Sequence, residues 1–149
     1  MSDNWLRYVP SDPQYQPSPD QARAAEILLA EFLPQAEEIS SEFSDSPTFV
    51  DPGANFSGVL CPACKAHVDD WWAEAMSVAA ERSFSSLQVR TPCCGATTSL
   101  NDLHYVWPAA FGRYVLEAMN PNEKQLGLER VTHLGSVLGC AIREVQVHV

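Results

Sequence analysis

Four cysteines in two close pairs are the residues of this chain best suited to chemistry. Cys61 and Cys64 are separated by two residues, and the adjacent Cys93 and Cys94 follow after residues 65–92. Thiolates at such spacing are soft ligands that suit Zn²⁺, and four of them complete a tetrahedral shell. A complete shell leaves no position for water or substrate. The sequence therefore predicts a structural zinc site formed by Cys61, Cys64, Cys93 and Cys94.

The first pair has the form of a metal-binding knuckle. Two residues between the thiolates let both sulfurs reach one metal, and the tight turn points backbone N–H groups at the sulfurs. This pattern resembles the zinc-ribbon family, in which two cysteine knuckles clamp a zinc ion. The resemblance covers residues 59–96 and is carried by Cys61, Cys64 and the Cys94-Gly95 step.

The second pair departs from the zinc-ribbon pattern. When Cys94-Gly95 is aligned with that family, Thr91 stands at the place of the first cysteine. We expect the neighbouring Cys93 to serve as the fourth ligand instead. His67 and His104 are the alternatives that the sequence leaves open, because imidazole also binds zinc. The fifth cysteine, Cys140, is distant in sequence and is expected to be a buried small apolar residue.

Composition limits the class of partner. The 149 residues include nine basic and nineteen acidic side chains, giving a formal net charge of −10. Nucleic acids and anionic membrane surfaces are bound largely through Lys and Arg, so we expect no nucleic-acid and no membrane partner. A basic protein is the partner that this charge favours. The oligomeric state leaves no mark in the sequence.

The chain has no apolar run long enough to span a bilayer and no N-terminal pattern of a signal peptide. We therefore expect a cytoplasmic, reducing environment, in which clustered cysteines bind metal rather than form disulfides.

Hydrophobic spacing predicts strands and helices in alternation before the first cysteine pair. Residues 4–9 read as a strand, and Pro19-Asp20 opens a helix that Pro34 kinks or breaks. Residues 48–50 suggest a short second strand. The apolar face assigned to the helix consists of Ala25, Leu29, Phe32, Ala36, Ile39 and Phe43.

A second group of elements is expected beyond the first cysteine pair. Asp69 or Asp70 starts a helix between the knuckles, and residues 87–91 form a strand. Residues 111–119 alternate as a strand. Asn120 is the expected N-cap of a helix, with Pro121 and Glu123 behind it, that ends at Gly139. Residues 143–149 form a last strand whose inward residues are Val145, Val147 and Val149.

This order predicts an α+β fold. With residues 57–104 set aside, the elements run strand, helix, strand, strand, helix, strand, which resembles the ferredoxin-like split βαβ sheet. Residues 1–149 would form a single domain, with a four-cysteine zinc-binding module inserted at 57–104. The aromatic stretch 103–111 would pack this module onto the sheet, or serve as a protein-docking patch.

Together these features predict a small acidic zinc-binding protein that acts as a non-catalytic protein-interaction module. The enzymatic alternative is a thiol-disulfide oxidoreductase. In that class Cys61 would attack from a helix N-terminus and Cys64 would resolve the mixed disulfide. A zinc hydrolase would need an open site and a general base, and the sequence lacks a His-Glu-x-x-His pattern.

Overall fold

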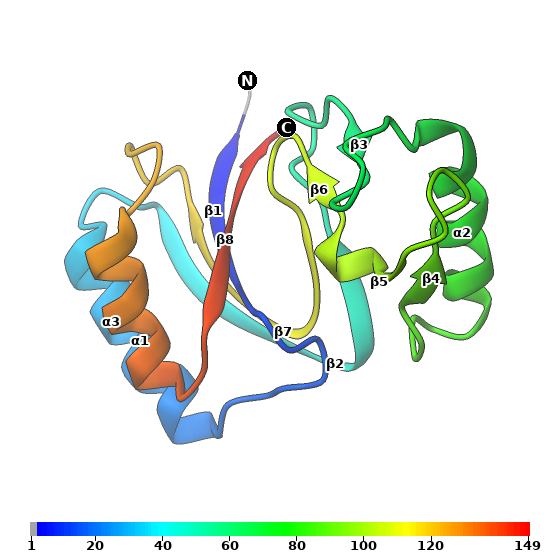
Figure 1. The fold of residues 1–149 in the computed structure, drawn as a ribbon. Coiled ribbons are helices and arrows are strands. Elements are labelled where there is room, and N and C mark those ends of the chain that lie inside the picture. The colour runs from blue at the N-terminus through cyan, green and yellow to red at the C-terminus, as the bar shows by residue number, and fades with distance from the viewer. Residues whose placement is uncertain (1–2) are drawn as a thin grey trace.

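The computed structural model describes residues 3–149, and its centre is a four-stranded antiparallel sheet (Figure 1). The strand order is β2-β7-β1-β8, so the first and last strands of the chain are neighbours. The bounds are β1 Asn4–Pro10, β2 Glu38–Val50, β7 Ala110–Met119 and β8 Ile142–His148.

Two helices, α1 (Pro19–Phe32) and α3 (Leu128–Leu138), cover one face of this sheet (Figure 1). Tyr114, Leu116 and Ala118 share this face of β7, as their alternation predicts, and all three are buried. They pack with apolar side chains of both helices, including Leu29 and Leu134. No helix among residues 3–149 is long and apolar enough to cross a membrane.

The prediction that helical structure, kinked or broken at Pro34, continues to Phe43 was wrong. Ser18 and Gln21 form a capping box that starts α1, and the helix ends at Phe32, two residues before Pro34. Ile39 and Phe43 instead lie on β2, which is much longer than the predicted strand at 48–50. Their spacing of four fits a strand as well as a helix, because residues an even number apart share one face of a sheet. Pairing with β7 decided the outcome.

The helix start predicted at Asn120 was also wrong. Asn120 has a positive φ of 47°, and its side-chain amide donates to the carboxylates of Asp3 and Glu37. The cap signal is thus used in a turn at the end of β7, and α3 begins later, after Gly127. Gly139 ends α3 in the left-handed conformation, as predicted.

The last strand follows the prediction except at its end. Val145 and Val147 are buried, whereas Val149 is 66% exposed. Val145 and Val147 lie on the face of the sheet opposite the helices, together with Val9 and Val115.

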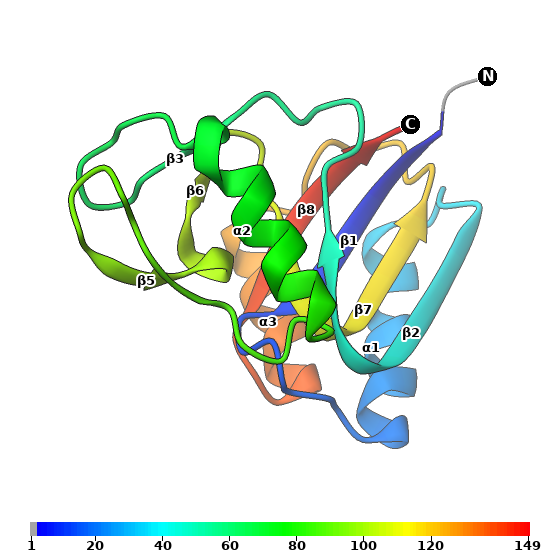
Figure 2. The ribbon, with the colours of Figure 1, turned by 90° about the vertical axis from the view of Figure 1, so that its right-hand side faces the viewer.

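The chain between β2 and β7, residues 51–109, lies against that opposite face; we call it the connecting segment (Figures 1 and 2). It has its own core, which joins the sheet through Phe49 and Phe111. Its elements are β3 Val59–Leu60, α2 Asp69–Glu81, β4 Gln88–Arg90, β5 Thr97–Ser99, the 3-10 turn Leu100–Asp102 and β6 His104–Tyr105.

Asn101 anchors the connecting segment to the sheet, and the sequence analysis did not single it out. It is 3% exposed. Its Oδ1 accepts from the N–H of Phe111 (2.9 Å) and its Nδ2 donates to the carbonyl of Ser11 (3.1 Å). The Arg143 guanidinium donates to its backbone carbonyl. One buried residue thus joins the connecting segment to the starts or ends of three strands, two through its side-chain amide and one through its backbone carbonyl.

We predict that Asn101→Ala lowers the free energy of unfolding by about 2–4 kcal/mol, because it leaves the buried N–H of Phe111 and the partly buried carbonyl of Ser11 unpaired. Asn55→Ala is the matched control: its Nδ2 makes one bond, to the carbonyl of Gln146, from a half-buried position. We expect that change to cost less than about 1 kcal/mol. Urea unfolding followed by tryptophan fluorescence measures both, and equal losses would contradict the anchoring role of Asn101.

Candidate metal centre

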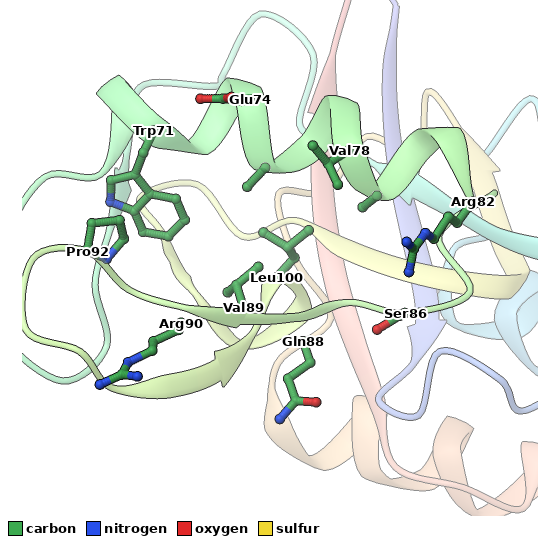
Figure 3. A pocket seen from close by; sticks show the side chains of 12 residues that line it. Trp71, Glu74, Val78, Arg82, Ser86, Gln88, Val89, Arg90, Pro92 and Leu100 are labelled. Atoms are coloured by element: carbon green, nitrogen blue, oxygen red, sulfur yellow. The ribbon is translucent and has the colours of Figure 1, made fainter.

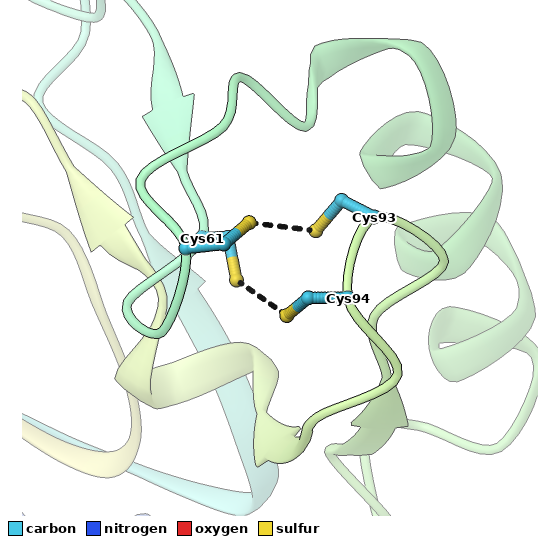
Figure 4. Close-up of side chains that lie close together, drawn as sticks. Cys61, Cys93 and Cys94 are labelled. Carbon is cyan, nitrogen blue, oxygen red and sulfur yellow. Dashed lines mark hydrogen bonds between the residues drawn. The ribbon is translucent and has the colours of Figure 1, made fainter.

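The four predicted ligands come together at one end of the connecting segment. The Sγ atoms of Cys61, Cys64, Cys93 and Cys94 all lie within 4.8 Å of one another. The Sγ–Sγ distance is 3.8 Å from Cys61 to Cys94 and 3.4 Å from Cys64 to Cys93 (Figure 4). Each close contact therefore joins one cysteine pair to the other. These four thiols could hold a metal ion.

The first pair forms a tight turn after β3. The N–H of Cys61 donates to the carbonyl of Ala66 (2.8 Å), and the N–H of Lys65 donates to the carbonyl of Cys61 (2.9 Å). Lys65 has a φ of 66°, a conformation that costs free energy for a residue with a Cβ. The turn points the backbone N–H groups of Ala63 and Cys64 at the Cys61 sulfur.

The second pair forms the same turn, with Thr91 in the place of Cys61. The N–H of Thr91 donates to the carbonyl of Ala96 (2.8 Å), and the N–H of Gly95 donates to the carbonyl of Thr91 (2.7 Å). Gly95 has a φ of 73°, matching Lys65. The alignment that put Thr91 at the first ligand position therefore describes the backbone correctly.

Thr91 supports the cluster without supplying a sulfur. It is 1% exposed, and its Oγ1 lies 3.3 Å from the Sγ of Cys94. The same oxygen accepts from the N–H of Ala96 (3.1 Å). Cys93, at a middle position of the turn, supplies the fourth sulfur from the exposed side.

Hydrogen bonds distribute the charge of the cluster unevenly. The N–H of Cys64, then that of Ala63, lowers the pKa of Cys61 to about 6 despite its burial. The Thr91 hydroxyl, and then the N–H of Ala96, lowers the pKa of Cys94. Desolvation and the neighbouring thiols of Cys64 and Cys61 raise the pKa of Cys93 to about 12. The turns thus favour the thiolate forms of Cys61 and Cys94 over that of Cys93.

The remaining candidates do not join the cluster. His67 and His104 are exposed, and both lie beside Leu60 through backbone pairing. His67 has Asp69 as its ion-pair neighbour, at 3.8 Å. Cys140 packs against the core of α1 and α3 but is half-buried, and not fully buried as predicted. Burial raises the pKa of its thiol.

Helix α2 separates the two turns and packs them onto one core. It starts at Asp69, as predicted, so Cys61 and Cys64 lie in the preceding loop and not at its N-terminus. Trp72 is stacked on Phe56, and its Nε1 donates to the Tyr105 hydroxyl (3.2 Å). The stripe of Val68, Trp72 and Ala79 thus belongs to the core of the connecting segment.

Comparison of the chain with models of protein families, with curated proteins and with solved structures finds no match.

Substituting the residue of positive φ should change the stability of the protein in opposite directions in the two turns. Lys65→Gly should stabilise the protein by up to about 1 kcal/mol, because glycine adopts a positive φ without strain. Gly95→Ala should destabilise it by about 1 kcal/mol. The added Cβ meets only the Arg90 guanidinium, at 3.6 Å, so backbone strain is the main cost. Thermal unfolding of both variants checks this, and a loss from Lys65→Gly would contradict it.

Proposed function

We propose that Cys61, Cys64, Cys93 and Cys94 bind one Zn²⁺ as a structural ion. The distances between the sulfurs carry this proposal. Sulfurs 2.3 Å from a tetrahedral zinc ion lie about 3.8 Å from one another. The observed contacts of 3.8 and 3.4 Å are close to that value, and all four sulfurs fall within 4.8 Å. An all-thiolate donor set also favours zinc over harder divalent cations.

Such an ion would join two parts of the connecting segment that contact each other little through regular structure. The first turn follows β3, and the second lies between β4 and β5. Each of these strands belongs to a two-stranded sheet. Structural zinc supplies on the order of 10 kcal/mol in small metal-dependent modules. Four thiolates fill the coordination shell, so a structural role is favoured over catalysis.

The strand order supports a finer assignment of the fold. Numbered along the chain, the four strands of the main sheet run 2-3-1-4 across it, and both crossing helices lie on one face. We assign this arrangement to the ferredoxin-like split βαβ class. In this assignment the protein is a single domain, 1–149. A zinc-binding module at 57–104 lies in the connection between β2 and β7, the second and third strands of the main sheet along the chain.

We assign the protein a non-catalytic role in binding another protein, in a reducing compartment such as the cytoplasm. The charge of −10 favours a basic partner. The aromatic stretch 103–111 is divided: Tyr105 and Phe111 are buried, whereas Val106 is 47% and Trp107 is 40% exposed. Tryptophan is a common anchor of protein interfaces. Part of the stretch thus supports packing, and part supports docking.

Thiol-disulfide exchange is the second candidate. The lowered pKa of Cys61 favours it, because a thiolate is the attacking species. Two features weigh against it. Cys61 is fully buried, and its sulfur contacts that of Cys94 in the other turn, at 3.8 Å.

Metal content separates these two functions. Elemental mass spectrometry of natively purified protein should give one zinc per chain. A thiol count on the same folded sample should give one reactive cysteine, Cys140. A metal-free protein with a Cys61–Cys64 disulfide would overturn the zinc proposal and favour redox chemistry.

The position of Thr91 gives a test by rescue. Cys93→Ser should weaken zinc binding by more than the about 10- to 100-fold typical of losing a supporting hydrogen bond, since it removes a ligand. Adding Thr91→Cys to that variant puts a cysteine at the position equivalent to Cys61 and should restore most of the affinity. Competition with a chromophoric chelator measures both.

Cys140→Ser is the matched control and should leave zinc affinity unchanged, since that thiol lies outside the cluster. Unchanged affinity in Cys93→Ser would show that Cys93 is not a ligand.

A further inference from the structure

A groove of about 420 Å³ lies between helix α2 and strand β4 (Figure 3). Its lining is mainly apolar and includes Ala75, Val78, Val89 and Leu100. Val78 is 55% exposed at its border. The helix supplies one wall and the strand the other, so the groove is open along its length and suits an extended chain.

Two arginines without partners line this groove in an otherwise acidic protein. Within residues 3–149, the side chains of Arg82 and Arg90 have neither an ion pair nor a hydrogen bond. The other five arginines all bond to carboxylates or backbone carbonyls. Glu74 is the single acidic residue of the lining. The local charge is therefore positive and complements carboxylates.

Strand β4 also presents free backbone groups on the side away from β5. The N–H of Leu100 donates to the carbonyl of Leu87 (2.7 Å), and the N–H of Thr91 donates to the carbonyl of Ala96 (2.8 Å). Hydrogen-bonded positions alternate along an antiparallel pair, so the backbone N–H and C=O groups of Gln88 and Arg90 point away from β5. The described chain pairs no strand with this edge. Such an edge is a template for an added strand.

Trp71 lines the groove, and its indole Nε1 is buried with no partner among the described residues. Because this nitrogen is buried, Trp71 presents its apolar ring to the groove and not its N–H. Trp71 and Pro92 lie at the same end of the groove (Figure 3).

We propose that the groove between α2 and β4 binds an extended segment of a partner protein that alternates apolar and acidic side chains. The segment adds a strand to the free edge of β4 through Gln88 and Arg90, as in other cases of strand addition. Its apolar side chains lie against Val78 and Val89. Its carboxylates pair with Arg82 and Arg90. A partner of basic overall charge can carry such a segment.

This inference deepens the proposed protein-binding function and rests on it. Arg90 and Pro92 flank Thr91 at the start of the second cysteine turn, and the Arg90 guanidinium lies beside Gly95. A metal ion that fixes this turn therefore also fixes one wall of the groove. Removing the metal should weaken binding of the segment.

The test is selection of seven-residue peptides displayed on phage against the full-length, zinc-loaded protein. We expect the selected peptides to alternate Asp or Glu with Val, Ile or Leu. The tightest one, made with a fluorescent label, should bind about tenfold or more weakly to the double variant Arg82→Glu/Arg90→Glu, because two attractions become repulsions. Selection against that variant should shift to Lys and Arg.

Matched changes test the geometry. Arg23→Glu/Lys124→Glu alters the net charge equally at exposed sites outside the groove, and should change peptide affinity by less than about twofold. Two peptides are made, one N-methylated at the odd-numbered amides and one at the even-numbered amides. Only one of these two sets of N–H groups faces β4, so one peptide should lose binding and the other should keep it. Equal loss of affinity in the two N-methylated peptides would overturn strand addition.

The outcomes for the groove and for zinc are separable when zinc is measured in each sample. Three results with zinc-loaded protein would overturn the inference and leave the metal site standing. The protein could select no peptide, it could select basic peptides, or acidic peptides could bind the Arg82→Glu/Arg90→Glu variant as tightly as the original protein. Acidic peptides that bind a metal-free protein equally well support the groove and overturn its dependence on the metal. Displacement of the peptide by oligothymidylate at equal concentration would show recognition of generic polyanions and also overturn the inference.

Discussion

The connecting segment depends on two turns meeting, because its regular structure is too short to hold it. Its four strands have two or three residues each and form two separate ladders. Isolated two-stranded ladders are marginal in water. Burial of Val59, Val68 and Leu100 helps, but the second cysteine turn is exposed at four of its residues, 92–95. The convergence of the sulfurs therefore constrains everything built on that turn, including β4 and the groove beside it.

Similar turns at the two ends of the cluster arise from a simple backbone requirement. Each turn needs a residue of positive φ directly after its last cysteine, which is Lys65 in one and Gly95 in the other. Each closes with a pair of main-chain hydrogen bonds that does not depend on the side chain at its first position. Thr91 can therefore occupy that position while a neighbour supplies the sulfur. The two turns therefore share one backbone conformation but differ in which of their positions carry a cysteine.

Sequence reasoning succeeded where the signal was local and failed where pairing decided the outcome. The four cysteines, α2, β7 and the turn at Gly139 carry their own patterns and were predicted. Ile39 and Phe43 satisfy a helix and a strand equally, so only the partner β7 could settle their structure. Asn120 has the chemistry of a cap but bonds to Asp3 and Glu37, which are distant in sequence. Asn101 was missed for the same reason: both partners of its side chain are brought to it by the fold.

The pairing of Val50 with Ala110 has a consequence for how this chain can change. These two residues are direct neighbours across β2 and β7, and they bracket the entire connecting segment. Its entry and exit therefore lie one strand spacing apart, the distance that a tight hairpin turn closes. The sheet with its two helices can in principle exist with a short turn in this place, provided that the apolar side chains that the connecting segment covers, including Phe49 and Phe111, become polar. The architecture thus admits gain, loss or exchange of the whole segment as one unit, without any change to the register of the sheet.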